Sequence, residues 1–236
     1  MIDKLIFRAF RAIEEPDTCI GYREGHVSVL KDYGVTGITT NNDEWFHNPN
    51  VYGIVAQLVS TGEIVGGIRA QISDENTPLP IEKALGKMDP VIYDIVKNFR
   101  DNGGCGELCG LWNAKSVAGI GISILLTRAA ISTTNQLDFE TLMGICAEYT
   151  MDMFKRVGFV VNPNLGLKGE YPYPNENYIT RVLGIMNATT LATANEYDKM
   201  RMKSLREFPT QTATEMHGEH KVEVQYNLIY KTNSND

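Results

Sequence analysis

The spacing of apolar residues in the first third of the chain predicts helices followed by a β-hairpin. In residues 2–14 the apolar side chains recur at helical spacing, which predicts a short amphipathic helix. Residues 20–33 mix apolar and charged side chains in a pattern that predicts another helix. Two β-rich runs, 51–60 and 63–71, are separated only by Thr61 and Gly62, which predicts a tight antiparallel hairpin.

The middle of the chain predicts a loop, a helix and then a strand that leads into a glycine turn. Residues 73–90 contain three prolines and predict an irregular crossing loop, and residues 91–99 predict a short helix. The segment ELCGLWNA at 107–114 predicts a strand. The residues that follow, 115–121, predict a turn, and the apolar pattern then predicts a helix through about Thr133.

The last third of the chain predicts two more helices and three more strands. Residues 139–157 predict a helix that ends at Gly158 and is followed by a short strand. The side chains expected on one side of this helix are Leu142, Ile145, Cys146, Tyr149, Met153 and Val157. The tail predicts a strand near 179–187, a charged helix near 194–207 and a strand over 221–231 with clear alternation.

The order of these elements and the length of the chain predict one α/β or α+β domain over residues 1–236. A chain of 236 residues with 43% hydrophobic content can bury one sizeable core and is too short for two large domains. Helices alternate with strands, and the hairpin favours a mixed, mostly antiparallel central sheet flanked by helices.

Charge and composition exclude several classes of function. The formal net charge of −7 argues against a nucleic-acid binder, which needs a basic face to neutralise phosphates. The longest apolar run is shorter than the roughly 20 residues that span a bilayer, so we expect no association with a membrane. Charged residues interrupt the apolar N-terminus, unlike a secretory signal, and this favours a cytoplasmic protein with four reduced cysteines.

The turn between the strand 107–114 and the next helix is suited to binding an anion. Backbone N–H groups are unpaired at the start of a helix, and glycine lets a phosphate approach the main chain. The turn fails the dinucleotide pattern GxGxxG because position 124 is Ile, and it fails the Walker pattern because no Lys follows Gly121. A turn that simply packs tightly stays open as the alternative.

A third pattern, [QR]xxGx[GA], fits the turn at Gly119 and Gly121, with Ser116 where Gln or Arg is usual. This pattern is the pyrophosphate loop of the GNAT (GCN-related N-acetyltransferase) superfamily, and the order of elements resembles that fold. The segment FKRVGF is similar to the Y-x-K-x-G-F ending of a GNAT helix. The resemblance therefore implies a GNAT-like acyltransferase domain.

Within that superfamily, the chain resembles the acyl-homoserine-lactone synthases and N-acyl amino acid synthases. The resemblance rests on Arg23 and Tyr33 ten residues apart, the acidic segment Asp43-Glu44-Trp45-Phe46, the Gly-x-x-Arg of the hairpin ending in Arg69, and the strand that begins at Glu107. Gly110 stands where the branch has Arg, and Phe46 stands where it has a second Asp. The resemblance implies substrate-binding roles for Arg23, Tyr33, Asp43 and Trp45.

The resemblance also implies the substrates. The acyl donor would be acetyl-CoA, a longer acyl-CoA or an acylated acyl carrier protein, and no metal is implied. The acceptor would be an amine of a small molecule such as an amino acid. The expected donor-binding residues are Trp112, Asn113, Ala114, Ser116, Val117, Ala118, Gly119, Ile120 and Gly121. A long acyl chain would run past the helix expected over 139–157.

Acyl transfer to an amine needs a group that takes up the amine proton, and Glu107 is the candidate by resemblance. The plain alternatives are a solvated carboxylate and an ion pair with Arg69. Arg69 would itself bind an acceptor carboxylate or anchor Glu107 or Asp43, because Arg is rarely buried without a partner. Main-chain N–H groups near residues 112–114 would polarise the thioester carbonyl.

Many GNAT enzymes place a Tyr where this chain has Phe154, and that Tyr protonates the departing thiolate. The role is therefore vacant here or filled by another residue. This departure keeps a second interpretation open, in which the chain is a non-catalytic GNAT-like module that binds an acyl ligand or a protein.

Overall fold

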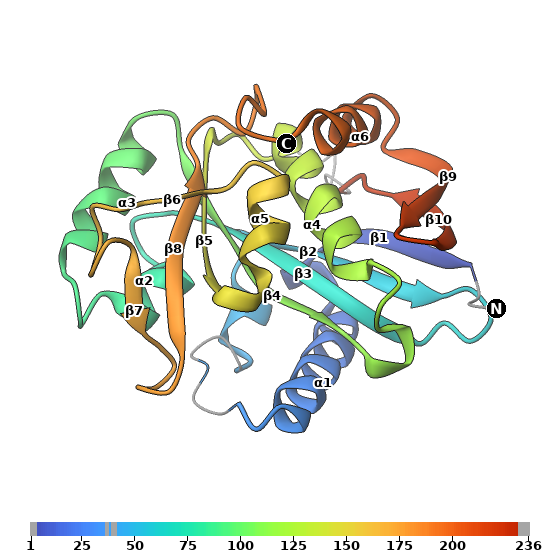
Figure 1. The fold of residues 1–236 in the computed structure, drawn as a ribbon, viewed down its shortest axis with the longest axis horizontal. Coiled ribbons are helices and arrows are strands. Elements are labelled where there is room, and N and C mark those ends of the chain that lie inside the picture. Colours follow the sequence, from blue (N-terminus) through green and yellow to red (C-terminus); the bar gives the residue numbers. More distant parts are fainter. Residues whose placement is uncertain (1–3, 36–37, 39–41, 231–236) are drawn as a thin grey trace.

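The computed structural model describes residues 4–35, 38 and 42–230, and a ten-stranded sheet forms its centre (Figure 1). The strands are β1 (Leu5–Arg11), β2 (Val51–Leu58), β3 (Ile64–Ile72), β4 (Cys105–Asn113), β5 (Thr141–Ala147), β6 (Val160–Val161), β7 (Glu170–Pro172), β8 (Ile179–Ile185), β9 (Thr210–His217) and β10 (His220–Asn227). Their order in the sheet is β6-β8-β5-β4-β3-β2-β1-β10-β9, with β7 paired to β8. Among the described strands, the β4–β5 and β1–β10 pairs are parallel and the other pairs are antiparallel.

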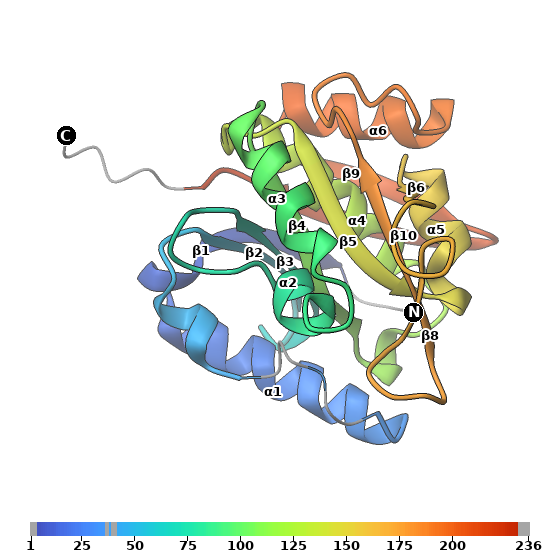
Figure 2. The same cartoon turned by 90° about the vertical axis from the view of Figure 1, so that its left-hand side faces the viewer.

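Helices cover both faces of the sheet, as Figure 2 shows from the side. The α-helices are α1 (Pro16–Asp32), α2 (Pro80–Leu85), α3 (Val91–Asp101), α4 (Ile122–Ser132), α5 (Met151–Arg156) and α6 (Glu196–Glu207). The side chains of α4, α5 and α6 join the largest core cluster on one face, whereas α1, α2 and α3 pack in two smaller clusters on the other. The fold is therefore a mixed, mostly antiparallel sheet between two layers of helices, as the sequence predicts.

Several predicted elements are confirmed with small shifts of their ends. The hairpin is present as β2 and β3, and its strands pair from Val51 opposite Gln71 to Gln57 opposite Ile64. The strand before the glycine turn is β4, and the helix after the turn is α4. The helices α1, α3 and α6 and the strands β8 and β10 also lie where the pattern predicts them.

The prediction of a helix over residues 2–14 is wrong, because this segment forms the strand β1 and one turn of 3-10 helix. Leu5, Phe7 and Ala9 are buried with the period of two that a strand requires. Leu5 and Ala9 are also four residues apart, so the same apolar residues fit helical spacing. The strand lies between β2 and β10 and hydrogen-bonds on both edges. Tertiary pairing therefore decides between two periods that the short segment satisfies equally.

The prediction of one helix over residues 139–157 is also wrong. Its first half is the central strand β5, and its second half is a 3-10 turn followed by the short helix α5. Leu142 packs in the core cluster on one face of the sheet, and Met143 packs in the cluster on the other. A strand buried on both faces is apolar without alternation, and a short apolar run of this kind is easily mistaken for helix.

Three smaller elements are also not predicted, and one of them is the short strand β7. The segment 73–90 is not wholly irregular, because α2 begins at Pro80 in the first-turn position that proline favours. The strand β9 precedes β10 and forms an added hairpin with it at the β1 edge of the sheet. In the part of the chain that the structure describes, no helix is long and apolar enough to cross a bilayer.

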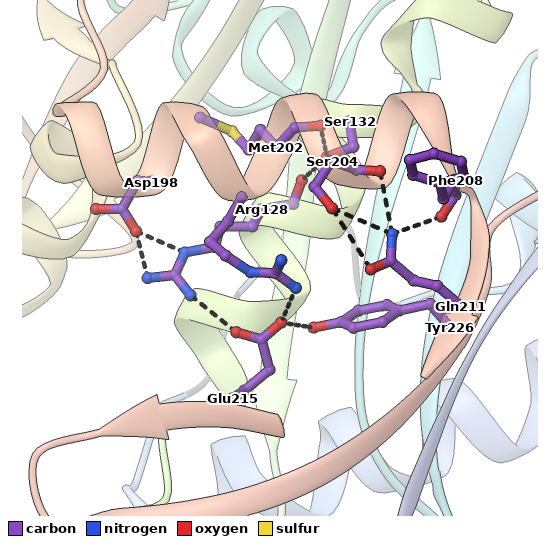
Figure 3. Close-up of polar contacts among 10 residues, drawn as sticks. Arg128, Ser132, Asp198, Met202, Ser204, Phe208, Gln211, Glu215 and Tyr226 are labelled. Atoms are coloured by element: carbon purple, nitrogen blue, oxygen red, sulfur yellow. Dashed lines mark hydrogen bonds and ion pairs between the residues drawn. The ribbon is translucent and has the colours of Figure 1, made fainter. Parts of the chain in front are cut away.

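Buried charges connect α6 and this added hairpin to α4, as Figure 3 shows. Arg128 of α4 forms ion pairs with Asp198 of α6 and with Glu215 of β9, and all three side chains are almost fully buried. The Nε atom of Arg128 donates to Asp198 Oδ1 at 2.5 Å, and Tyr226 donates to Glu215 Oε1 at 2.9 Å. We call Arg128, Asp198 and Glu215 the α4–α6 ion cluster.

Candidate active site

The parallel strands β4 and β5 separate halfway along their length. They pair from Cys105 opposite Thr141 to Leu108 opposite Gly144, after which β5 continues only with β8. β4 continues with β3, but its register shifts between Arg69 and Gly67. Gly110 lies in the resulting bulge at φ +61°, a conformation that favours glycine. The sheet therefore opens on the β5 side of this bulge.

A cavity of about 220 Å³ occupies this opening, and we call it the β4–β5 cavity. Residues 109–111 of β4 and 145–147 of β5 line its two sides. Its remaining lining residues are His26, Leu30, Val35, Ile38, Ile68, Pro80, Ala84, Glu107, Leu108, Tyr149, Thr150, Phe154, Tyr173, Pro174, Tyr178 and Thr180. The lining is mainly apolar, with few polar groups, which is typical of a binding site for a small molecule.

Glu107 is the buried carboxylate of the β4–β5 cavity, with none of its surface exposed to solvent. Its Oε2 accepts a hydrogen bond from the Ile81 N–H at 2.7 Å, whereas Oε1 has no hydrogen-bond partner among the described residues. Burial raises the pKa of Glu107 to about 8, and the Ile81 N–H and Arg69 oppose this shift only in part. The side chain therefore exchanges a proton near neutral pH.

Arg69 lies on β3 directly opposite Cys109 of β4 and is only 4% exposed. Its Nε donates to Cys109 Sγ at 3.2 Å, and its guanidinium carbon lies 4.3 Å from the centre of the Trp45 ring. A smaller polar cavity of about 110 Å³, which we call the Arg69 pocket, lies here. It is lined by Asn42, Glu44, Trp45, Asn48, Arg69, Gln71, Thr77, Pro80 and Lys83, and it shares Pro80 with the β4–β5 cavity.

The other residues expected to bind substrate are only partly brought together. Arg23 forms an ion pair with Asp43, so these two residues meet each other. Trp45 is buried against Arg69 and lines the Arg69 pocket. Tyr33 is 68% exposed and lines neither cavity.

The glycine turn lies between β4 and α4, as expected. The side chains of Val117 and Ile120 are buried and anchor the turn, whereas Ser116, Ala118 and Gly119 are exposed. The N–H groups of Val117 and Ala118 donate within the turn to Ala114 and Lys115. No side chain among the described residues caps α4, so the N–H groups of its first turn remain available for an anion.

Gly119 and Gly121 adopt φ angles of +82° and +86°, but their surroundings differ. A Cβ at Gly119 would have no atom within 4 Å, so the exposed turn is open at this point. A Cβ at Gly121 would lie only 2.6 Å from His217 Cβ, because the β9–β10 hairpin packs against the turn here. Gly119 therefore offers the close backbone approach that a phosphate needs, whereas Gly121 is required for packing.

Residues 112–114 are held in the sheet by β3 and do not line the β4–β5 cavity, although their main-chain N–H groups are expected to polarise the thioester carbonyl. Trp112 and Asn113 pair with Gly67 and Gly66 of β3, and the Ala114 N–H donates to the Val65 carbonyl at 2.8 Å. The Trp112 ring packs against α1 and Tyr22 rather than into the β4–β5 cavity. The backbone that borders the cavity is instead the bulge at 109–111.

Two features of the cavity have no counterpart in the sequence predictions. His26 of α1 is buried and lines the β4–β5 cavity together with Glu107. The hydroxyl of Tyr22, one helical turn earlier, donates to the Gly110 carbonyl and holds the bulge. Across the residues that the structure describes, no group of three or more His, Cys, Asp or Glu side chains could hold a metal ion.

Comparison with known proteins gives matches at the level of structure. No protein-family model matches the sequence, and no curated protein sequence matches it. The N-acyl amino acid synthase FeeM from uncultured soil microbes superposes with a TM-score of 0.58 and 11% identity, over 80% of this chain and 99% of FeeM.

Two acyl-homoserine lactone synthases are also similar in structure. The CoA-dependent synthase BjaI, solved with SAM and isopentyl-CoA, gives a TM-score of 0.55 and 14% identity, over 87% of this chain and 91% of BjaI. The synthase LasI gives 0.55 and 16%, over 81% of this chain and 95% of LasI. The chain therefore has the fold of the GNAT-type acyltransferases and of the acyl-homoserine lactone and N-acyl amino acid synthases.

Proposed function

We propose that this protein is an N-acyltransferase that moves an acyl group from a thioester donor to the amino group of a small molecule such as an amino acid. The observation that carries this proposal is the position of Glu107. A buried carboxylate with a raised pKa and an unpartnered oxygen borders a cavity between two separating strands. The same strand, β4, leads directly into a glycine turn and a helix start suited to a diphosphate.

The glycine turn would hold the diphosphate of acyl-CoA or the phosphate of an acylated acyl carrier protein. Gly119 leaves open space beside the main chain, and the dipole of α4 favours an anion at its start. Ser116, Ala118, Ile120 and Gly121 complete this turn, so they are the remaining proposed donor contacts. The thioester end of the donor would then enter between β4 and β5 and reach the bulge at 109–111.

The acyl group would occupy the β4–β5 cavity. The cavity is far larger than the space that one water needs, and aliphatic and aromatic side chains form most of its lining. An apolar chain that enters it gains free energy from leaving water. This lining favours a donor with an acyl chain longer than acetyl.

The acceptor would be bound through the Arg69 pocket. Arg69 and Lys83 give this pocket its positive charge, and Lys83 Nζ lies 2.9 Å from Glu44. A guanidinium stacked on the Trp45 ring is well suited to a carboxylate, so an amino acid fits this pocket. The pocket and the β4–β5 cavity share the lining residue Pro80, so an acceptor held by Arg69 would direct its amino group past Pro80 toward Glu107. Arg23, Asp43 and Tyr33 line neither cavity, and they would contact the acceptor only as it enters.

Glu107 would take up the proton that the amine loses when the amide bond forms. A carboxyl group with a pKa of about 8 is a stronger base, once ionised, than an ordinary carboxylate. The hydrogen bond from the Ile81 N–H fixes Glu107 Oε2 and leaves Oε1 for the substrate. Phe154 lines the cavity where many GNAT enzymes have a Tyr, so the thiolate must take its proton from another group or from water.

The first experiment measures donor binding with Gly119→Ala and a matched control. Calorimetric titration of the wild type with acetyl-CoA and longer acyl-CoAs should show binding, and Gly119→Ala should weaken it at least about tenfold because its methyl group fills the phosphate space. Gly62→Ala is the control, because Gly62 has φ +74° and no atom within 4 Å of an added Cβ, but lies in the β2–β3 turn. Equal effects of the two substitutions would remove the turn from the donor site.

A second candidate function is a non-catalytic module that binds an acyl ligand, and the observation that favours it is Phe154. Release of free thiol from acyl-CoA, measured with a panel of amino acids and other amines, separates the two functions. Amine-dependent thiol release supports the enzyme. Tight thioester binding without thiol release or amide product from any amine supports the binding module.

A further inference from the structure

His26 is a second buried polar group of the β4–β5 cavity, on a different element from Glu107. It lies on the face of α1 that packs against the sheet, with Tyr22 one turn before it and Leu30 one turn after it. His26 is 8% exposed, and it lines the cavity together with Leu30. The helix therefore presents one polar side chain to a mainly apolar cavity.

The imidazole of His26 forms no hydrogen bond or ion pair with any residue in the described ranges. Its ring instead lies edge-to-face with the Tyr22 ring, at 6.4 Å between ring centres. Buried polar groups in folded proteins nearly always have hydrogen-bond partners, and exceptions commonly mark a ligand site. Glu107 Oε1 is a fully buried oxygen without a hydrogen-bond partner among the described residues, and Glu107 lines the same cavity.

The imidazole is neutral when the protein is at neutral pH. Burial, and to a smaller extent the positive charge of Arg69, lower the pKa of His26 to about 4. A neutral imidazole has one nitrogen that donates a hydrogen bond and one that accepts. The cavity therefore holds an uncharged acceptor nitrogen in addition to the Glu107 oxygen.

We propose that His26 accepts a hydrogen bond from the second N–H of the acceptor amine and makes the site selective for primary amines. This inference rests on the proposed acyltransferase function. A neutral primary amine has two N–H groups, so it can satisfy Glu107 and His26 at once. A secondary amine or a hydroxyl has only one hydrogen to donate and leaves one of the two buried groups unpaired, which is costly.

One of the two amine hydrogens leaves the nitrogen during the reaction, and the other stays on it. The amine nitrogen forms the C–N bond to the thioester carbonyl carbon, and the C–S bond breaks. The proton directed at Glu107 leaves the nitrogen and is returned to the thiolate, directly or through water, so that free thiol is the second product. The hydrogen held by His26 stays on the nitrogen as the amide N–H. His26 thus orients the nitrogen lone pair without changing its own protonation state.

The test compares a primary amine acceptor with its N-methyl derivative. In the wild type, kcat/KM should favour the primary amine by roughly 5- to 150-fold, the range expected for one unpaired buried group. His26→Phe keeps a ring of similar shape but removes both nitrogens, so this preference should fall toward the value set by the methyl group alone. His26→Gln restores an acceptor and a donor and should recover part of the preference. His220→Phe, at an exposed histidine of β10, is the control.

Each outcome has one meaning. Loss of the preference in folded His26→Phe, with recovery in His26→Gln and none of these changes in His220→Phe, supports the role of His26. An active wild type whose preference is unchanged in both His26 variants overturns that role and leaves the acyltransferase function standing. A wild type that acylates no amine overturns the proposed function, and the role of His26 with it. If His26→Phe does not fold, the ratio measured for His26→Leu, which also removes both ring nitrogens, decides.

Discussion

Two buried polar regions of this protein differ in how their charges are balanced. In the α4–α6 ion cluster, Arg128 is 2% exposed and lies between the carboxylates of Asp198 and Glu215 (Figure 3). In the β4–β5 cavity, Glu107 is just as buried, but its Oε1 has no hydrogen-bond partner among the described residues. The His26 ring, which lines the same cavity, also forms no hydrogen bond with a described residue. In the first region every charge has an ion-pair partner, even though Arg128 Nη1 and Glu215 Oε2 form no hydrogen bond with a described residue. In the second region, Glu107 Oε1 has neither an ion-pair partner nor a hydrogen bond among the described residues.

The difference separates a structural role from a functional one. Partners on α6 and β9 fix Arg128, so the cluster holds the C-terminal elements against α4. Glu107 is compensated in part, by the Ile81 N–H and the charge of Arg69, whereas its Oε1 and the His26 ring form no hydrogen bond with a described residue. Such groups persist where a ligand uses them. Burial alone does not mark an active site. Burial without partners, beside a cavity, does.

The largest expected effect is on catalysis, from Glu107→Gln. Gln has nearly the same shape and can still accept the Ile81 N–H, but it cannot take up a proton. We expect kcat for acyl transfer to fall by roughly 100- to 10,000-fold, the range usual for removal of a general base. The affinity for the thioester donor, measured by calorimetry, should stay close to that of the wild type.

Glu82→Gln is the matched control for this substitution. Glu82 is also buried, and burial is the main cause that raises its pKa. It lies on α2 next to Ile81, whose N–H donates to Glu107, but it does not line the β4–β5 cavity. It should therefore retain near wild-type kcat. An equal loss of activity in both variants would mean that the buried charge of this region, rather than the position of Glu107 at the cavity, matters.

The next effect is on stability, from Arg128→Met. This change removes the cation that the two buried carboxylates share, while Asp198 keeps its ion pair with Arg156 and Glu215 keeps its ion pair with Arg201. We therefore expect the free energy of unfolding to fall by about 3 kcal/mol, the lower end of the range for a broken buried pair. Urea denaturation measures it, and Lys4→Met, which removes an exposed ion pair of 2.6 Å with Glu223, should change stability little. A folded Arg128→Met protein that binds donor normally but has lost acyl transfer would break the comparison between the two regions.

The sequence predicts the backbone of the donor site better than the side chains of the acceptor site. The strand β4, the glycine turn and the helix α4 follow one another along the chain, so local patterns are enough to find them. The β4–β5 cavity instead depends on where two parallel strands stop pairing, which is a property of the assembled sheet. The sequence predicts a helix over 139–157, but its first half is the strand β5, so the acyl path expected past that helix is not present in that form.

Gly110 and His26 show two limits of reasoning from sequence. Gly110 departs from the pattern of the synthases, where Arg is expected. The structure gives a reason, because a Cβ there would lie 2.8 Å from the Tyr22 hydroxyl and the residue has φ +61°. His26 was not singled out, since a lone histidine in a mixed helix carries no signal. Its helical spacing from Tyr22, on the buried face of α1, becomes informative only when the cavity is known.

The smallest expected effect is the dependence of stability on pH that Glu107 contributes. Its pKa is raised from an ordinary value of 4.5 to about 8, so between these values the unfolded chain loses the proton while the folded protein keeps it. The folded state then binds more protons than the unfolded state, and the stability contributed by the protonated carboxyl is present below pH 4.5 and is lost as pH rises toward 8. Glu107→Gln removes this loss, so the variant should gain stability relative to the wild type as pH rises. The gain between pH 4.5 and 7 should be about 3 kcal/mol, or 1.36 kcal/mol per pH unit.

Urea denaturation of both proteins across this pH range gives the difference, in which the other titrating groups cancel. A difference that does not change with pH would show that Glu107 ionises normally, and the β4–β5 cavity would then lose its strongest distinction from the α4–α6 ion cluster.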